Sequence, residues 1–193
     1  MTLLQVTPDD APDRVLLRTR DRSKITEVLA ECPVRLRDWP VHGPADPGTT
    51  EEQILARYRR EIDSLCAEEG LRLVDVVRFH PEDTPEWRDR AAKARAAFLE
   101  EHRHEEDEVR FFAQGAGCFY LHVHRKVYAV VCEAGDLLSV PAGTMHWFDM
   151  GPRPDFCAVR FFEREDGWVG DFTGDPIARD FPRLDALLAG AGE

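Results

Sequence analysis

Short segments rich in β-branched and aromatic residues, separated by glycine or proline, dominate the chain after residue 105. In order they are DEVRFFAQG, GCFYLHVHRK, KVYAVVCE, DLLSVPAG, MHWFDM and FCAVRFFE. Such regular spacing of short strands is typical of a β-sandwich or barrel. The sequence therefore predicts a β-barrel core over about residues 101–165.

The part before the barrel, about residues 1–100, is expected to be mainly helical. A possible cap and apolar residues at helical spacing predict a helix over residues 23–31, SKITEVLAE. Thr50 precedes EEQILARYRREIDSLCAEEG, whose final glycine predicts the end of a second helix. A third helix is expected from Pro85 through AAKARAAFLEEH, after a strand at LRLVDVVRF. The predicted class is therefore α+β, mainly β, with the N-terminal helices packed outside a barrel.

The 193 residues suffice for one domain with a sizeable core, so we expect a single domain over residues 1–193, with a tail that forms a short helix after Asp180. A formal net charge of −12 repels a phosphate backbone, so we expect no nucleic-acid partner. No apolar run approaches the ~20 residues of a membrane helix, and the N-terminus shows no signal-peptide pattern. Five widely spaced cysteines without a Cys-x-x-Cys motif fit a reduced, cytoplasmic protein.

The stretch EHRHEEDEVRFF contains the strongest candidates for metal ligands. His102 and His104 lie two residues apart and Glu108 has the same parity, so all three share one face if the chain is extended. Two imidazoles and a carboxylate suit a divalent first-row metal. His146 follows a tight Pro-x-Gly corner at Gly143, and an adjacent antiparallel strand could place it opposite the histidine pair.

The other acids nearby are not expected to be metal ligands, although their charge could strengthen the local field for a cation. The remaining acids of the stretch are interpreted as surface charge: Glu101, Glu105, Glu106 and Asp107. A second His-x-His pair, His122 and His124, is also expected to face solvent. The alternate positions of that strand are apolar and predict its core face: Phe119, Leu121 and Val123.

These motifs resemble those of the cupin superfamily. HRHEEDE followed by Gly115 is similar to the first cupin motif, and the spacing from Gly135 through a Pro-x-Gly turn to His146 is similar to the second. Met150 stands where that second motif usually ends in asparagine. Within the superfamily, EDEVRFF, KVYAVVCEAGDLLSVPAGTMHWFDMG and VRFF resemble the acireductone dioxygenase family over roughly residues 98–174.

The resemblance implies a jelly-roll barrel in which one divalent ion per chain, Fe²⁺ or Ni²⁺, is bound by His102, His104, Glu108 and His146. It also implies a dioxygenase that cleaves 1,2-dihydroxy-3-keto-5-methylthiopentene, the acireductone of methionine salvage, with O₂. The iron form would give 2-keto-4-methylthiobutyrate and formate. The nickel form would give 3-methylthiopropionate, formate and CO. We expect the metal to act as Lewis acid and template, and the protein to be a monomer.

Two arginines and three aromatic residues are candidates for substrate binding. Arg110 shares the face of Glu108, and a guanidinium inside a barrel needs an anionic partner. That partner could be the bound enolate, which would make Arg110 its electrostatic partner, or it could be Glu108 or a neighbouring acid. Arg160 could likewise contact the substrate or form an ion pair within the barrel. The resemblance places three further side chains along an apolar pocket, although each could be an ordinary core residue: Phe98, Phe148 and Trp168.

Two other functions remain open from the sequence. The chain could be a non-catalytic cupin that binds a small ligand through a structural metal, or a cupin isomerase that uses zinc on a sugar phosphate. A non-catalytic cupin would be expected to lack a ligand, and none is missing here. A phosphate site would require several Lys or Arg residues near the pocket, whereas mainly Arg110 and Arg160 are present.

Overall fold

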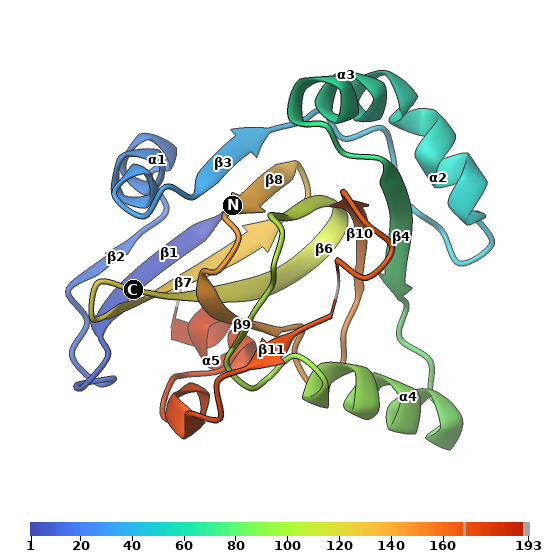
Figure 1. Ribbon diagram of the computed structural model, residues 1–193. Coiled ribbons are helices and arrows are strands. Elements are labelled where there is room, and N and C mark those ends of the chain that lie inside the picture. The colour runs from blue at the N-terminus through green and yellow to red at the C-terminus, as the bar shows by residue number, and fades with distance from the viewer. Residues whose placement is uncertain (168, 191–193) are drawn as a thin grey trace.

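The computed structural model describes residues 1–167 and 169–190, and its strands form a continuous antiparallel arrangement (Figure 1). One sheet runs in the order β11 (Asp171–Phe172), β5 (His102–Arg103), β9 (Met145–Asp149), β6 (Glu108–Val123), β7 (Lys126–Glu133), β1 (Leu3–Pro8) and β2 (Leu17–Thr19). The other consists of β4 (Leu73–Phe79), β10 (Phe156–Phe162), β6, β8 (Asp136–Val140) and β3 (Arg35–Asp38). The predicted mainly β class is confirmed.

Strand β6 belongs to both sheets because it bends near its middle. Its first half pairs with β8 and β10, and its second half pairs with β7 and β9 (Figure 1). Gly115 lies at the bend with a φ of +71°, and a Cβ there would lie 1.9 Å from the Asp155 carbonyl oxygen. A Cβ at Gly117 would lie 2.4 Å from the Phe148 ring. Only glycine fits these two positions, so they allow the sheets to close on each other.

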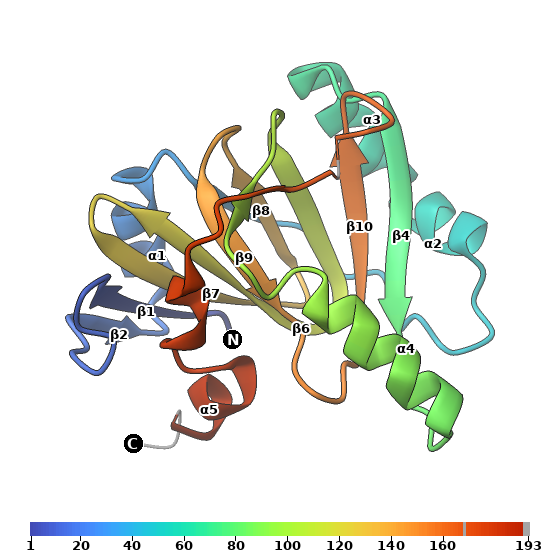
Figure 2. The same ribbon diagram turned by 60° about the horizontal axis from the view of Figure 1, so that its bottom comes forward.

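The helices lie outside the strands (Figures 1 and 2). They are α1 (Arg22–Ala30), α2 (Glu51–Arg57), α3 (Arg59–Glu69), α4 (Pro85–Ala96), the 3₁₀ helix η1 (Pro176–Arg179) and α5 (Leu184–Ala189). Helix α4 buries Trp87 and Ala91 in the core, below β4 and β10 in Figure 2. Among the described residues, no helix has the length and apolar character needed to cross a bilayer.

The helix boundaries differ in detail from those predicted. Helix α1 begins one residue earlier than expected, because Asp21 accepts a hydrogen bond from the Lys24 amide and caps it. The expected second helix divides at Tyr58 into α2 and α3, although Thr50 forms the N-terminal capping box and Gly70 ends α3 in the left-handed conformation. Helix α4 stops at Ala96, which leaves the following residues free to enter β5.

The sequence predicts a single strand before residue 100, the one that forms β4, but the structure also has β1, β2 and β3 there. Strand β1 pairs with β7 through six residues, and β3 pairs with β8. All six residues of β1, LLQVTP, are buried, so the strand lacks the alternation of buried and exposed residues that identifies a strand in a sequence. β2 and β3 are too short to give a pattern.

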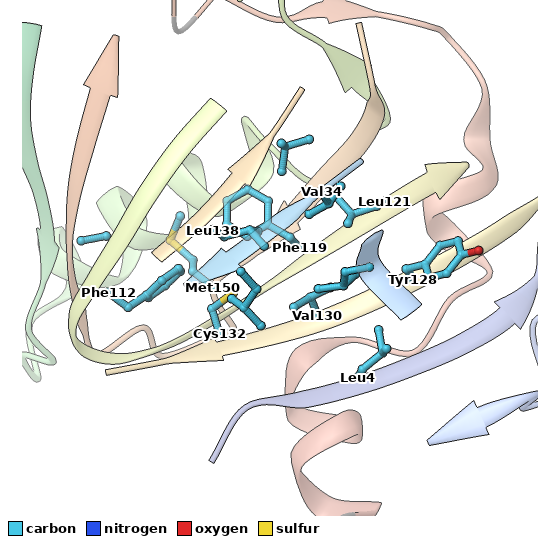
Figure 3. Close-up of a cluster of buried hydrophobic side chains, with 14 of the residues drawn as sticks. Leu4, Val34, Phe112, Phe119, Leu121, Tyr128, Val130, Cys132, Leu138 and Met150 are labelled. Carbon is cyan, nitrogen blue, oxygen red and sulfur yellow. The ribbon is translucent and has the colours of Figure 1, made fainter. Parts of the chain in front are cut away.

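The main apolar cluster fills the space between the two sheets (Figure 3). Its side chains include Leu4 of β1, Phe112, Phe119 and Leu121 of β6, Tyr128, Val130 and Cys132 of β7, and Leu138 of β8. All five cysteines are free thiols. Burial raises the pKa of the Cys118 and Cys132 thiols well above the usual value, which fits the packing role expected from the sequence.

Asp149 joins strand β9 to two helices. Its carboxylate is fully buried and accepts hydrogen bonds from Arg95 of α4, at 2.7 and 3.1 Å, and from the backbone amides of Gly151 and Leu184. Burial alone would raise the pKa of Asp149, but the Arg95 guanidinium and the two amides more than offset this and lower it. The end of β9 is therefore held by an ionised, fully paired carboxylate.

Replacing this carboxylate should destabilise the fold. We expect Asp149→Asn to lower the free energy of unfolding at pH 7 by about 3 kcal/mol, because it leaves the Arg95 charge without its buried partner. The depressed pKa means that the carboxylate stabilises above its unfolded pKa of about 4 and loses this effect as the pH falls through the folded value. The difference between wild type and variant in urea unfolding should therefore shrink in acid.

The matched control is Asp89→Asn. Asp89 forms an exposed ion pair with Lys93 on the same helix as Arg95, so its loss should leave the urea transition nearly unchanged. An equal shift for both variants would mean that the Asp149 network does not stabilise β9.

Candidate metal centre

Strands β5 and β9 bring three histidines together. His102 and His146 are direct cross-strand partners, with ring centroids 4.6 Å apart. His104 leaves β5 two residues later, with its ring 5.1 Å from His102 and 5.2 Å from His146. All three side chains are buried. Arg103, which lies between His102 and His104, is exposed, as the alternation of an extended chain requires. One ligand atom from each histidine lies within 4.8 Å of the others.

A backbone carbonyl fixes the orientation of each imidazole. The Nδ1 atom of His102 lies 2.8 Å from the Glu100 carbonyl oxygen. That of His104 lies 2.9 Å from the Val169 carbonyl oxygen, and that of His146 lies 2.8 Å from the Thr144 carbonyl oxygen. Because a carbonyl oxygen can only accept, each Nδ1 carries the proton and each Nε2 keeps its lone pair. This arrangement is the usual way in which proteins orient histidines toward a metal.

Glu108 completes the group from the first position of β6. Its Oε2 lies 2.7 Å from His146 Nε2 and 3.4 Å from His104 Nε2. Neither Glu108 Oε2 nor His146 Nε2 has a hydrogen-bond partner within the described part of the chain, and both atoms are buried. A carboxylate oxygen and an unprotonated nitrogen are both acceptors and repel each other at this distance unless a cation lies between them. The donor set of three nitrogens and one oxygen fits a divalent first-row metal.

At His102 and Glu108 the local electrostatics favours the protonation states that bind metals. Burial, followed by the nearby His146, lowers the pKa of His102 to about 4, so its imidazole is neutral at pH 7. Burial alone would raise the pKa of Glu108, but the Arg110 guanidinium 2.8 Å away lowers it well below the usual value. The centre therefore presents a neutral imidazole and an ionised carboxylate.

The centre opens into a cavity of about 50 Å³ between the sheets. Phe98 and Phe148, both predicted from the sequence, line it, together with Phe112, Phe119 and Met150. The backbone amide of Phe148 donates to the Phe98 carbonyl oxygen over 2.8 Å, which joins these two walls. The third predicted aromatic residue, Trp168, lies outside the described residues. An apolar cavity with polar groups at one end is typical of a small-molecule site.

Both predicted arginines line this cavity, and each already contacts a carboxylate. Arg110 Nη2 lies 2.8 Å from Glu108 Oε1. Arg160 binds Asp75 through two nitrogens, at 2.7 and 2.5 Å. The ion pair considered for each arginine is therefore present, and both guanidinium groups also adjoin the space that a ligand would occupy.

Two of the acids interpreted as surface charge are buried, so that prediction is wrong for them. Glu101 contacts His122 Nδ1 at 2.6 Å and accepts from the Thr173 hydroxyl at 2.8 Å. Glu106 accepts from the backbone amides of Glu163 and Arg164. Their partners lie at least 21 residues away in the chain, so the local run of acids does not reveal their burial.

His122 also differs from the expectation. Its side chain is only 15% exposed and lies between Glu101 and Asp9, whereas His124 is exposed in the turn after β6. Burial would lower the pKa of His122, but the larger effect of its hydrogen bond to Glu101 raises it. Within the described part of the chain, the three-histidine group consists of His102, His104 and His146 and does not include His122.

The two histidine pairs can be separated by mutation. We expect His104→Ala to weaken Ni²⁺ binding by at least about 100-fold, because it removes a donor to the centre. His122→Ala should retain one Ni²⁺ per chain. Isothermal titration and metal analysis measure both quantities. Equal losses in the two variants would contradict the assignment of the centre to the first pair.

The chain is similar to known proteins over nearly its whole length. The model of the ARD/ARD' family matches residues 2–170. The chain is 59% identical over 190 residues to acireductone dioxygenase 1 of Nocardia farcinica, covering 97% of this chain and 100% of that protein. It is 56% identical over 187 residues to the acireductone dioxygenase of Frankia alni, covering 97% and 91%.

A solved structure also matches. It is described as acireductone dioxygenase from Bacillus anthracis with cadmium ion in active center. The TM-score is 0.73 at 25% sequence identity, over 89% of this chain and 99% of that one.

Proposed function

The chain belongs to the acireductone dioxygenase family, and we propose that it binds Fe²⁺ or Ni²⁺ through His102, His104, Glu108 and His146. Its fold is that of the cupins, and its activity is that of a metal-dependent dioxygenase on acireductone and O₂. Identity of 59% along nearly the whole chain favours this activity over the isomerase and the non-catalytic cupin.

One observation in particular supports the proposed ligands. Glu108 Oε2 and His146 Nε2 are buried acceptors 2.7 Å apart, and each Nδ1 of the three histidines is occupied by a backbone carbonyl. The four inward atoms therefore lack donors of their own, and a divalent cation would satisfy all of them. When bound, the cation supplies Lewis-acid stabilisation and a template for the ene-diolate of the substrate.

The remaining residues of the cavity would bind and orient the substrate. Arg110 places a positive charge beside Glu108, where it would neutralise the anionic oxygens of the ene-diol. The apolar walls from Phe98 and Phe148 would hold the methylthioalkyl tail and exclude water from the reacting end. Trp168 is proposed as a further contact on the basis of the family resemblance.

We propose that the bound metal determines the products. The iron form would give 2-keto-4-methylthiobutyrate and formate, within methionine salvage. The nickel form would give 3-methylthiopropionate, formate and CO.

We further propose that the whole chain works as one domain, as a monomer in the cytoplasm, without nucleic acid or membrane partners. Pairing of β1, β3 and β4 with the barrel strands supports a single domain. Free cysteines and a net charge of −12 support the location and the absence of nucleic acid.

The activity can be tested directly. Protein loaded with Fe²⁺ or with Ni²⁺, with occupancy confirmed by metal analysis, should consume O₂ when acireductone is added. Product analysis should detect CO only from the nickel form. If neither loaded form consumes O₂, the proposed reaction is wrong.

The role of Arg110 makes a second prediction. We expect Arg110→Met to lower kcat/KM by about 100-fold while Ni²⁺ is retained, because the charge that stabilises the developing anion is lost. Arg103→Met is the matched control: this exposed arginine lies between His102 and His104 in the chain but pairs with Asp171 on the surface. A similar loss in the control would indicate a general effect of removing positive charge.

A further inference from the structure

An open groove along β4 and β10 meets the internal cavity at two side chains. Phe98 and Arg160 line both spaces. The groove is further lined by residues that do not reach the cavity: Leu73, Val74, Asp75, Phe162, Arg164 and Glu165. Phe98 and Arg160 therefore mark the place where an outer space and the space beside the metal centre come together.

A row of charged side chains crosses the strands at this junction. Asp75 of β4 is the cross-strand partner of Arg160 of β10, which in turn is the partner of Arg110 of β6. Two like charges directly opposite each other destabilise a sheet, but here each arginine has its own carboxylate, Asp75 or Glu108. The row leads from the groove to the metal centre.

Phe162 supports both arginines. Its ring centroid lies 5.2 Å from the Arg110 guanidinium carbon and 5.3 Å from that of Arg160. Cation–π contacts at these distances favour one position for each guanidinium. Together with the bidentate ion pair to Asp75, the contact with Phe162 holds the Arg160 guanidinium at the side of the junction.

The opposite side of the histidine group is covered by protein. Strand β11 pairs with β5, and the Val169 carbonyl accepts from His104. A Cβ at Gly170 would lie only 3.2 Å from the His102 ring. In the groove, by contrast, Arg160 and Arg164 balance Asp75 and Glu165, so an anion is not excluded there despite the net charge of −12.

We propose that the anionic substrate reaches the metal centre through this groove, and that Asp75 is a positioning residue that holds Arg160 beside the junction. The inference rests on the proposed function, because it concerns how the acireductone anion arrives. Arg160 then guides the anion toward Arg110 without blocking the passage.

The route can be tested by narrowing the groove. Leu73 is 37% exposed and lines the groove but not the cavity. In Co²⁺-loaded protein, Leu73→Trp should slow the association of oxalate, a small oxygen-donor dianion, by about 10-fold as followed by visible absorption. kcat/KM for acireductone should fall similarly, with kcat nearly unchanged. Unchanged oxalate association would overturn the route.

Val15→Trp is the control for bulk. Val15 is 47% exposed and lines neither the groove nor the cavity, so the oxalate rate should match wild type. Equal slowing in both variants would also overturn the route. If wild-type protein binds oxalate at the metal but consumes no O₂ with acireductone, the proposed reaction fails while the oxalate rates still decide the route.

The positioning role needs a different comparison. Asp75→Asn should lower kcat/KM by about fivefold with kcat within about twofold, because an unpaired Arg160 leaves its position at the junction. Asp75→Glu should restore most of kcat/KM. In an Arg160→Gln background, Asp75→Asn should have no further effect. A full additional effect in that background, or an equal fall in kcat, would overturn the role.

Glu68→Gln controls for the change of net charge. Glu68 is an exposed partner of Arg37, away from the groove, and its replacement changes the charge by the same amount. Its kcat/KM should equal that of wild type, and a fivefold fall would overturn the positioning role of Asp75.

Discussion

A group of buried acceptors that face one another is the constraint on which the rest of the structure depends. Each of the three histidines uses its Nδ1 proton on a backbone carbonyl, so the inward Nε2 atoms and the Glu108 carboxylate have no proton to share. Such a group is unfavourable in a low-dielectric interior without a cation. A divalent ion bound between these atoms would offset the repulsion among them.

Much of the surrounding structure holds the strands that carry these ligands. Glycines at the bend of β6 let one strand serve both sheets, so that Glu108 from one half approaches the histidines of β5 and β9. Asp149 anchors the end of β9 to α4 and α5. On the substrate side, the pairing of β4, β10 and β6 aligns Asp75, Arg160 and Arg110 between the groove and the centre.

Several errors of prediction have one physical cause. Strand alternation correctly places His102 and His104 on one face, whereas the run of acids gives no local signal that Glu101 and Glu106 are buried against distant partners. Likewise, β1 has no alternating pattern because neither of its faces meets solvent. Local periodicity describes a residue only where one face of a regular element is buried and the other exposed.

The sequence by itself determined the mainly β class, the helices around α1 to α4, and the candidate ligands, because these follow from local periodicity and from fixed spacings within motifs. Only the tertiary structure decided which carboxylate each charge meets: Glu101 with His122, Asp149 with Arg95, and Asp75 with Arg160. These partners lie 21, 54 and 85 residues apart in the chain. Contacts over such separations depend on sheet register and on how the layers pack, and no local pattern in the sequence encodes either.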